Sequence, residues 1–125
     1  PSAEFNIYVD PEAADIVFKS GVRITVMPLD VTHKALTTQP RVDAFRDMGT
    51  SVGEAVAAWT DFFTRFDMEK YASPGAPLHD PCVIAYLIAP DLYSGRHDNV
   101  CVETTSALTL GKTVLAQRML RAFCR

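Results

Sequence analysis

The adjacent residues His79 and Asp80 combine an imidazole, which exchanges protons near neutral pH, with a carboxylate, which binds hard cations. Pro81 follows them and opens an apolar segment, so both side chains are expected at the start of a buried helix. One interpretation makes them a proton-transferring and metal-binding pair. The other makes Asp80 a helix cap and His79 an ordinary turn residue, as Asp10 and Pro11 suggest elsewhere in the chain.

A second polar pair lies near the start of the chain, where Glu4 and Asn6 flank Phe5. In an extended segment, successive side chains alternate between two faces, so Glu4 and Asn6 would share one face and Phe5 would take the other. Two polar groups on one face can hold a diol. The alternative is a solvated strand edge without a ligand, and the residues alone leave both interpretations open.

The elements that position these residues are indicated by caps and periodicity. Asp10-Pro11 predicts the start of a helix from Pro11 to Ser20, and Gly21 predicts its end. The alternating β-branched residues from Val22 to Met27 predict a strand, so the order is that of an α/β protein. The loop from Asp30 to Lys34 follows this strand at its carboxyl end, where we expect a wall of the site.

Two helices are predicted next, one from Arg41 to Met48 and a longer one opened by a capping box of Ser51 and Glu54. Apolar residues recur through the longer helix at steps of three and four, which is typical of a face packed in the core. An aromatic ligand-binding surface is the alternative. The residues of this stripe are Val52, Ala55, Val56, Trp59, Phe62, Phe63 and Phe66.

The second half of the chain begins with a turn-rich connection from Tyr71 to Leu78. The following helix, Cys82 to Ala89, is apolar on all sides and is therefore expected to be buried. Strands are predicted from Asn99 to Thr104 and from Lys112 to Leu115, with Gly111 between them. The predicted fold class is α/β, with helices flanking a small mixed sheet.

The charge and the hydropathy of the chain argue against two classes of partner, nucleic acids and membranes. The net charge of -3 is spread over 125 residues without a basic block, which argues against nucleic acid and against an anionic membrane surface. The longest apolar run, from Cys82 to Ala89, is far shorter than the roughly 20 residues of a bilayer span. Three widely spaced cysteines predict reduced, mostly buried thiols and a cytoplasmic protein.

Taken together, three separated segments resemble the inosine-uridine preferring nucleoside hydrolases in order and spacing, and most of all the branch that prefers pyrimidine ribonucleosides. The resemblance extends from Pro1 to about Ala116. It implies an open-sheet, Rossmann-like fold and a nucleoside, that is a ribose and a nucleobase, as the small-molecule partner. The three segments are AEFNIYVDPEAA (Ala3 to Ala14), LDVT (Leu29 to Thr32) and GAPLHDPC (Gly75 to Cys82).

The resemblance also implies roles for individual residues. In that family a Ca²⁺ ion binds the ribose hydroxyls and positions the attacking water. Asp80 matches a metal-binding aspartate that also reaches the ribose, and Glu4 and Asn6 match residues that grip the ribose hydroxyls. His79 matches the histidine that assists the leaving base, and Tyr71 lies where family members place residues on the base side.

The family's aspartate-rich amino-terminal motif has no counterpart in these 125 residues, and the helical segment Asp43 to Asp47 does not replace it. We therefore expect a single domain over 1–125, the carboxyl-side part of a ribonucleoside hydrolase that is inactive by itself. The alternative is a noncatalytic remnant that binds a nucleoside or a partner. A sheet with missing neighbours exposes edges and apolar faces, so we also expect self-association into a homo-oligomer.

Overall fold

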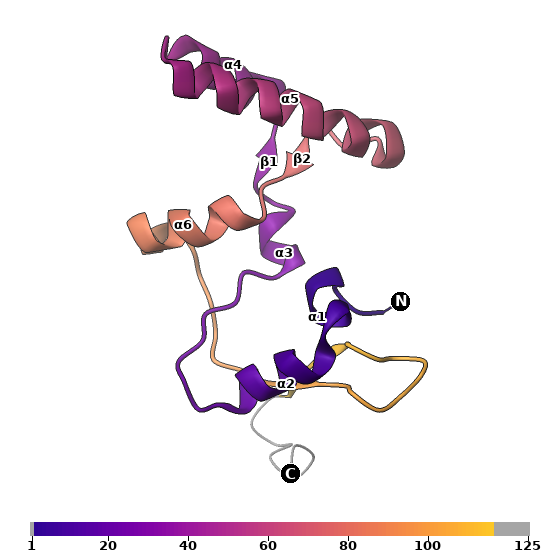
Figure 1. Cartoon of the computed structure of the whole chain (residues 1–125). Helices are drawn as coiled ribbons and strands as arrows, with labels where there is room; N and C mark the ends of the chain where they lie inside the picture. The colour runs from indigo at the N-terminus through magenta and orange to yellow at the C-terminus, as the bar shows by residue number, and fades with distance from the viewer. Residues whose placement is uncertain (1, 117–125) are drawn as a thin grey trace. The chain divides into compact units, whose positions relative to one another are not determined.

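The computed structural model describes residues 2–116, and among these it describes all side chains except those of residues 66–68, 70, 71 and 116. The chain divides into two compact units, and each is described separately below (Figure 1). The first unit combines the residues up to Val26 with those from Ser94 onward, and the second runs from Met27 to Tyr93. No helix in the described part is both long and apolar enough to cross a membrane. The single domain expected over 1–125 stays a prediction.

The first unit begins with two short helices, α1 (Phe5–Val9) and α2 (Pro11–Lys19). Asp10 caps α2, because its carboxylate accepts a hydrogen bond of 2.9 Å from a backbone N–H of the first turn. Gly21 follows the helix with a φ of +79°, a conformation that glycine adopts without strain. The helix predicted from this cap and this glycine is confirmed.

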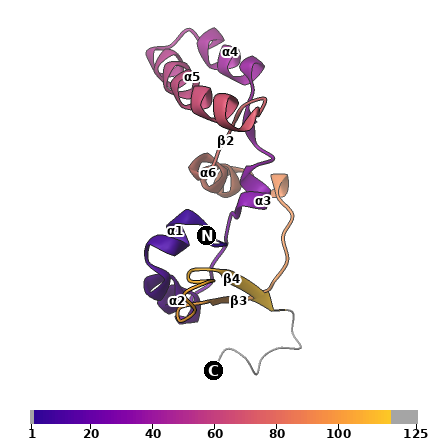
Figure 2. The same cartoon turned by 90° about the vertical axis from the view of Figure 1, so that its right-hand side faces the viewer.

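A hairpin completes the first unit, in which β3 (Asn99–Val102) pairs with β4 (Thr113–Ala116) in antiparallel register (Figure 2). Both predicted strands are confirmed in position. Gly111 precedes β4 with a φ of +77°, and a Cβ on it would lie 2.9 Å from the Cα of Tyr8. Glycine at this position therefore allows the loop to approach α1 closely. Cys101 in β3 is disulfide-bonded, so the prediction of reduced thiols is wrong for this residue.

The loop of this hairpin is organised by the carboxylate of Glu103, which follows β3. Its Oε1 accepts hydrogen bonds from the N–H and hydroxyl of Thr105, at 2.7 and 2.8 Å, and from the N–H of Ser106 at 3.0 Å. These donors, those of Thr105 first, hold the pKa of Glu103 below its usual value. The loop is therefore stabilised above the ordinary glutamate pKa, and that contribution disappears as the pH falls through the lowered one.

The strand predicted from Val22 to Met27 is wrong, since this segment is irregular in the structure. A strand needs a neighbour that pairs with its backbone N–H and C=O groups, and no described segment does so here. The alternation itself is present, because Val22, Ile24 and Val26 all line one hollow of about 180 Å³ next to the start of β3. A β-branched alternation marks one face of a segment, but it does not indicate whether a pairing partner exists.

The second unit places helices around a short pair of strands (Figure 1). Strands β1 (Leu36–Thr37) and β2 (Ala76–Pro77) pair in antiparallel register, with Leu36 opposite Pro77 and Thr37 opposite Ala76. The described residues thus contain two antiparallel strand pairs rather than one small mixed sheet, while the α/β class is confirmed. The elements are α3 (Leu29–Thr32), β1 (Leu36–Thr37), α4 (Gln39–Asp47), α5 (Ser51–Tyr71), β2 (Ala76–Pro77), α6 (Asp80–Ile88) and the 3₁₀ turn η1 (Pro90–Leu92).

Helix α5 packs on α4 through its smallest residues. Gly53 and Ala57 are buried, and a Cβ on Gly53 would lie only 2.3 Å from the carbonyl oxygen of Phe45 in α4. Arg46 of α4 pairs with Asp61 across the same contact. Small residues bring the two backbones together on this face, and Trp59, Phe62 and Phe63 lie on another, where all three are exposed. The expectation of a core face is therefore wrong for these three residues.

The N-terminus of α5 is capped by Thr50 rather than by the predicted box of Ser51 and Glu54. The hydroxyl of Thr50 accepts the N–H of Gly53 at 3.0 Å. Thr50→Ala is therefore expected to lower the free energy of unfolding by about 1 kcal/mol. Ser51→Ala, the matched control, should change it by less than about 0.5 kcal/mol. Urea denaturation followed by circular dichroism measures both, and a larger loss in the Ser51 variant would contradict the assignment.

Helix α6 departs most from the sequence-based expectation. It was predicted to be buried on all sides, but Val83, Ile84, Leu87 and Ile88 are between 48% and 79% exposed. Only Cys82 is buried, and its thiol donates to the carbonyl oxygen of Leu78 at 2.9 Å. An apolar composition favours burial, but burial requires neighbours, and α6 has them on one side only among the described residues.

Candidate functional site

The second unit carries a hollow of about 470 Å³ that contains both residues of the predicted His79-Asp80 pair. Such a volume is within the range of about 300 to 1,000 Å³ typical of small-molecule sites. Its walls come from β1, from α5 and from the stretch that runs from β2 into the first turn of α6. The lining residues are Thr37, Trp59, Thr60, Phe62, Phe63, Pro77, Leu78, His79, Asp80 and Pro81.

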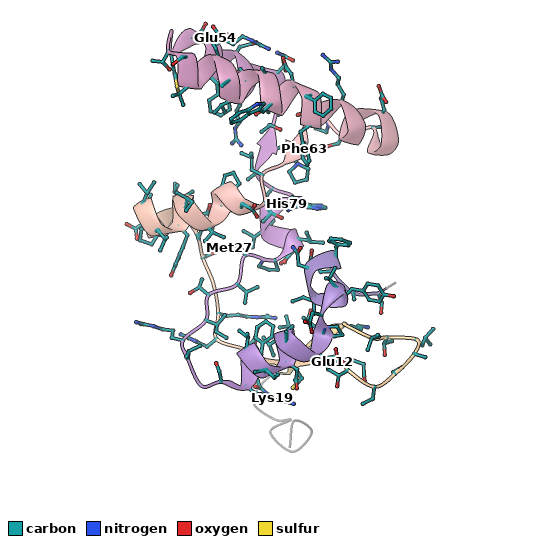
Figure 3. The ribbon with its side chains drawn as sticks, in the orientation of Figure 1. Glu12, Lys19, Met27, Glu54, Phe63 and His79 are labelled. Atoms are coloured by element: carbon teal, nitrogen blue, oxygen red, sulfur yellow. The ribbon has the colours of Figure 1, made fainter. Side chains whose placement is uncertain are left out.

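One wall of this hollow is aromatic. Trp59, Phe62 and Phe63 are 72%, 78% and 57% exposed, so these rings present their surface to solvent rather than to a core. Phe63 comes from the middle of α5, and His79 precedes α6 (Figure 3). Exposed aromatic faces next to a few polar groups are what flat, partly apolar ligands bind. These three rings therefore line the hollow, as the alternative interpretation of the stripe requires.

His79 is held by a residue far away in sequence. Its Nδ1 lies 2.9 Å from the hydroxyl oxygen of Thr32, which is 2% exposed and ends α3. The ring of His33 lies beside it, with 5.8 Å between ring centroids and a tilt of 58°. The predicted loop from Asp30 to Lys34 therefore does contact the site, although its first half is a short helix.

Asp80 is the first residue of α6, and His79 occupies the capping position. Neither side chain makes a capping hydrogen bond, so the interpretation of Asp80 as the helix cap is wrong. The Asp80 side chain is exposed, and within the described residues no hydrogen bond or ion pair engages it. The positive end of the helix dipole favours a carboxylate at this position. Asp80 is thus a negatively charged acceptor at the rim of the hollow.

Glu4 and Asn6 belong to the first unit, where they are not part of an extended segment. Glu4 is the N-cap of α1, and its Oε2 accepts the backbone N–H groups of Asn6 at 2.9 Å and of Ile7 at 3.3 Å. The predicted strand alternation is therefore wrong, because the capping carboxylate starts a helix instead. The ribose-binding role of Glu4 and Asn6 stays a prediction. Tyr71 is the last residue of α5, and its side chain lies outside the described part.

The sequence offered the aromatic wall only as the alternative to a core face, and it did not identify Thr32 as a partner of His79. Trp59, Phe62 and Phe63 repeat at helical spacing, and the same spacing describes a buried face. The one signal in the sequence is that α5 carries two small residues, Gly53 and Ala57, as well as the three large rings. Small residues allow two helices to approach closely, so they indicate the contact with α4. The Thr32 contact joins positions 47 apart and leaves no local signal.

The described residues do not provide a calcium site. Among them, no three carboxylate, imidazole or thiolate side chains lie close enough together to hold a metal ion. Calcium takes six to eight oxygen ligands, whereas the hollow contains the single carboxylate of Asp80. The helical segment Asp43 to Asp47 offers no replacement, because the carboxylate of Asp43 is engaged by Gln39 and Arg46.

Comparisons with known proteins give one consistent picture. The profile of the inosine-uridine preferring nucleoside hydrolases matches residues 1–122. The pyrimidine-specific ribonucleoside hydrolase RihA of Shewanella oneidensis is 50% identical over 92% of the chain and 36% of its own length. The structure superposes on the purine-preferring ribonucleoside hydrolase from Gardnerella vaginalis with a TM-score of 0.83 at 34% identity, covering 95% of this chain and 38% of that one.

A second solved structure, the plant nucleoside hydrolase PpNRh1, is similar with a TM-score of 0.79 at 32% identity, over 93% of this chain and 36% of that one. The chain therefore spans little more than a third of the length of the proteins it matches. None of these matches assigns a role to an individual residue of this chain.

Proposed function

Because the chain belongs to the inosine-uridine preferring nucleoside hydrolase family, we propose that it forms part of an enzyme that hydrolyses the N-glycosidic bond of purine or pyrimidine ribonucleosides. The products are ribose and the free base. The observation that carries the proposal is the hollow in which His79 and Asp80 lie next to an aromatic wall. The superpositions on two nucleoside hydrolases confirm the expected α/β, Rossmann-like fold class.

The proposed orientation of the nucleoside follows from the chemistry of the walls. A nucleobase is flat and aromatic, and it is placed against Trp59, Phe62 and Phe63, where stacking and burial of apolar area both favour it. The ribose hydroxyls are donors, and they are placed at the exposed carboxylate of Asp80. A carboxylate near the anomeric carbon also stabilises the positive charge that develops there as the base departs.

His79 is proposed to assist the departure of the base. During hydrolysis the C–N bond breaks with its electron pair moving to the base nitrogen, while a water oxygen forms a bond to the anomeric carbon and releases a proton to solvent. The base takes up one proton, so no proton is gained or lost overall. The base is a poor leaving group as an anion, so a proton or a hydrogen bond from the imidazole lowers the barrier. The described residues contain no cluster of carboxylates that would activate the water.

We propose that the enzyme depends on calcium. Asp80 would supply one ligand, and the other ligands would come from groups beyond the described residues. Glu4 and Asn6 are proposed to contribute to ribose binding, and Tyr71 to the base side. None of the steps assigned above to His79 or to the aromatic wall requires the metal.

The test compares the activity of this chain by itself with its activity as part of a full-length hydrolase. The 125-residue chain, incubated with uridine or inosine and CaCl₂, is expected to show no hydrolysis. A chimera in which the chain replaces the matching segment of the Shewanella oneidensis hydrolase is expected to release uracil from uridine. Turnover by the chain alone would contradict the need for additional residues, and a folded but inactive chimera would contradict the proposed role of the hollow.

The alternative is a noncatalytic module that binds a nucleoside, and it is favoured by the aromatic wall together with the lack of an acidic cluster among the described residues. Isothermal titration of the chain with uridine discriminates between the two. Binding that is equally tight with CaCl₂ and with EDTA favours the module. Binding that requires calcium, or no binding by the chain and turnover by the chimera, favours the enzyme.

We also propose that the protein is homo-oligomeric, while the cytoplasmic location stays a prediction. Large apolar side chains that do not line the hollow are exposed on α5 and α6, including Val52 at 70% and Ile88 at 79%, and extended apolar surface promotes association. The chain is therefore expected to be larger than 13.8 kDa in multi-angle light scattering. A monodisperse monomer at concentrations of about 100 μM would contradict this expectation.

A further inference from the structure

The burial of Thr32 determines which residue donates the hydrogen bond between Thr32 and His79. The hydroxyl of Thr32 is cut off from water, because the residue is only 2% exposed. A buried hydroxyl must place its hydrogen on an acceptor or lose the energy of a hydrogen bond. A threonine in a helix often donates to the carbonyl four residues earlier, but the Thr32 hydroxyl makes no such bond. Its one acceptor among the described residues is Nδ1 of His79, at 2.9 Å.

A neutral imidazole carries one proton, and an Nδ1 that accepts a hydrogen bond cannot carry it. We infer that Thr32 holds neutral His79 in the tautomer with its proton on Nε2, so that the histidine presents a hydrogen-bond donor to the hollow. The inference rests on the proposed function only in assigning the receiving atom to a nucleobase. Thr32 is in this sense a positioning residue, since it acts on a ligand through His79.

The remaining surroundings of the ring agree with this assignment. Within the described residues Nε2 has no hydrogen-bond partner, so this nitrogen is the one available to a ligand in the hollow that His79 lines. His33 contacts the ring through its face or edge and not through a hydrogen bond. When His79 is doubly protonated, the Thr32 hydroxyl can rotate and accept from Nδ1, so the ring orientation is kept in both charge states.

The group that meets Nε2 must be an acceptor, such as a carbonyl oxygen or an unprotonated ring nitrogen of a base, and not an N–H or an amino group. The same arrangement suits a departing base, because the electron pair that moves onto it makes its acceptors stronger while the donor is already aligned.

The tautomer is measured directly by NMR on the 125-residue chain with ¹⁵N-labelled histidine at a pH at which the imidazoles are neutral. His79→Gln assigns the His79 signals by their loss. The unchanged chain is expected to show predominantly the Nε2–H form. Thr32→Val removes the hydroxyl but keeps the shape, and it is expected to lower the ratio of Nε2–H to Nδ1–H about fivefold, as loss of one ordinary hydrogen bond implies. Thr32→Ser is expected to restore the ratio.

Two controls make the result specific. Thr64→Val removes another hydroxyl of a buried threonine, which pairs with Thr37 and not with His79, and should leave the ratio unchanged. The signals of His97, which belongs to the other unit, should not move in any variant. A dominant Nδ1–H form in the unchanged chain would overturn the inference, and so would a ratio that Thr32→Val leaves unchanged. The first of these outcomes is readable even if the valine variant fails to fold.

The experiments distinguish a failure of the proposed function from a failure of the proposed role of Thr32. An inactive chimera with the expected tautomer shift in the chain would contradict the proposed function and leave the role of Thr32 intact. In an active chimera, Thr32→Val is expected to lower kcat about fivefold with KM little changed, and Thr32→Ser to recover it. An active chimera whose kcat is indifferent to Thr32→Val would overturn the positioning role.

Discussion

Replacing His79 with alanine in the chimera is expected to lower kcat for uridine by roughly 10²- to 10⁴-fold, the usual contribution of a general acid, while KM changes little. The reason is that the imidazole acts on the base as it departs and contributes little to holding the intact nucleoside. His79 is exposed at the edge of the hollow, so its removal leaves no buried cavity. Steady-state release of uracil measures both constants.

The matched control is His97→Ala, since His97 is also exposed and does not line the hollow. A second measurement isolates the leaving group. A riboside of an acidic phenol departs without a proton, so the loss of kcat in the His79 variant should become several-fold smaller with it. An equal loss with both substrates would show that His79 acts on something other than the departing base.

Asp80→Asn in the chimera is expected to lower kcat/KM for uridine by about 10- to 100-fold, because a hydrogen bond to a charged group contributes roughly 1.5 to 3 kcal/mol. Asparagine keeps the size of the side chain and removes its charge. The proposed partner is the ribose, so 2′-deoxyuridine and 3′-deoxyuridine should be poor substrates of the unchanged chimera. The Asp80 variant should discriminate much less between these compounds and uridine.

Asp91→Asn serves as the control for this experiment, since Asp91 is an exposed aspartate in the first turn of η1 and does not line the hollow. Its kinetic constants should match those of the unchanged chimera. If Asp80→Asn and Asp91→Asn behave alike, Asp80 does not contact the ribose. If the Asp80 variant discriminates against the deoxynucleosides as strongly as the unchanged chimera does, the ribose hydroxyls are recognised by other residues.

The parts of this structure that could be predicted from sequence are those with local causes. Asp10-Pro11 and Gly21 bound α2 as expected, because a cap, a ring-constrained φ and a positive φ each act within a few residues. The strands of the hairpin were found for the same reason. The pair His79-Asp80 was found because its chemistry is carried by two adjacent side chains, whatever surrounds them.

The parts that were missed depend on neighbours distant in sequence. The segment from Val22 to Met27 has the pattern of a strand without a pairing partner among the described residues, and α6 has the composition of a buried helix with one covered side. Glu4 illustrates a different cause, since its carboxylate competes for backbone N–H groups and converts an apparent strand into a helix. Neither kind of competition is visible in hydrophobic periodicity.

The aromatic wall has a practical consequence for work on this chain. Trp59 is the single tryptophan in 125 residues, and it lines the hollow with 72% of its surface exposed. Its indole emission therefore reports on one place only. A solvated indole emits at long wavelength, and a base stacked on it would quench the emission and shift it to the blue. Trp59 is therefore an intrinsic fluorescent probe, which can report ligand binding in the hollow without a label and without any chemical turnover.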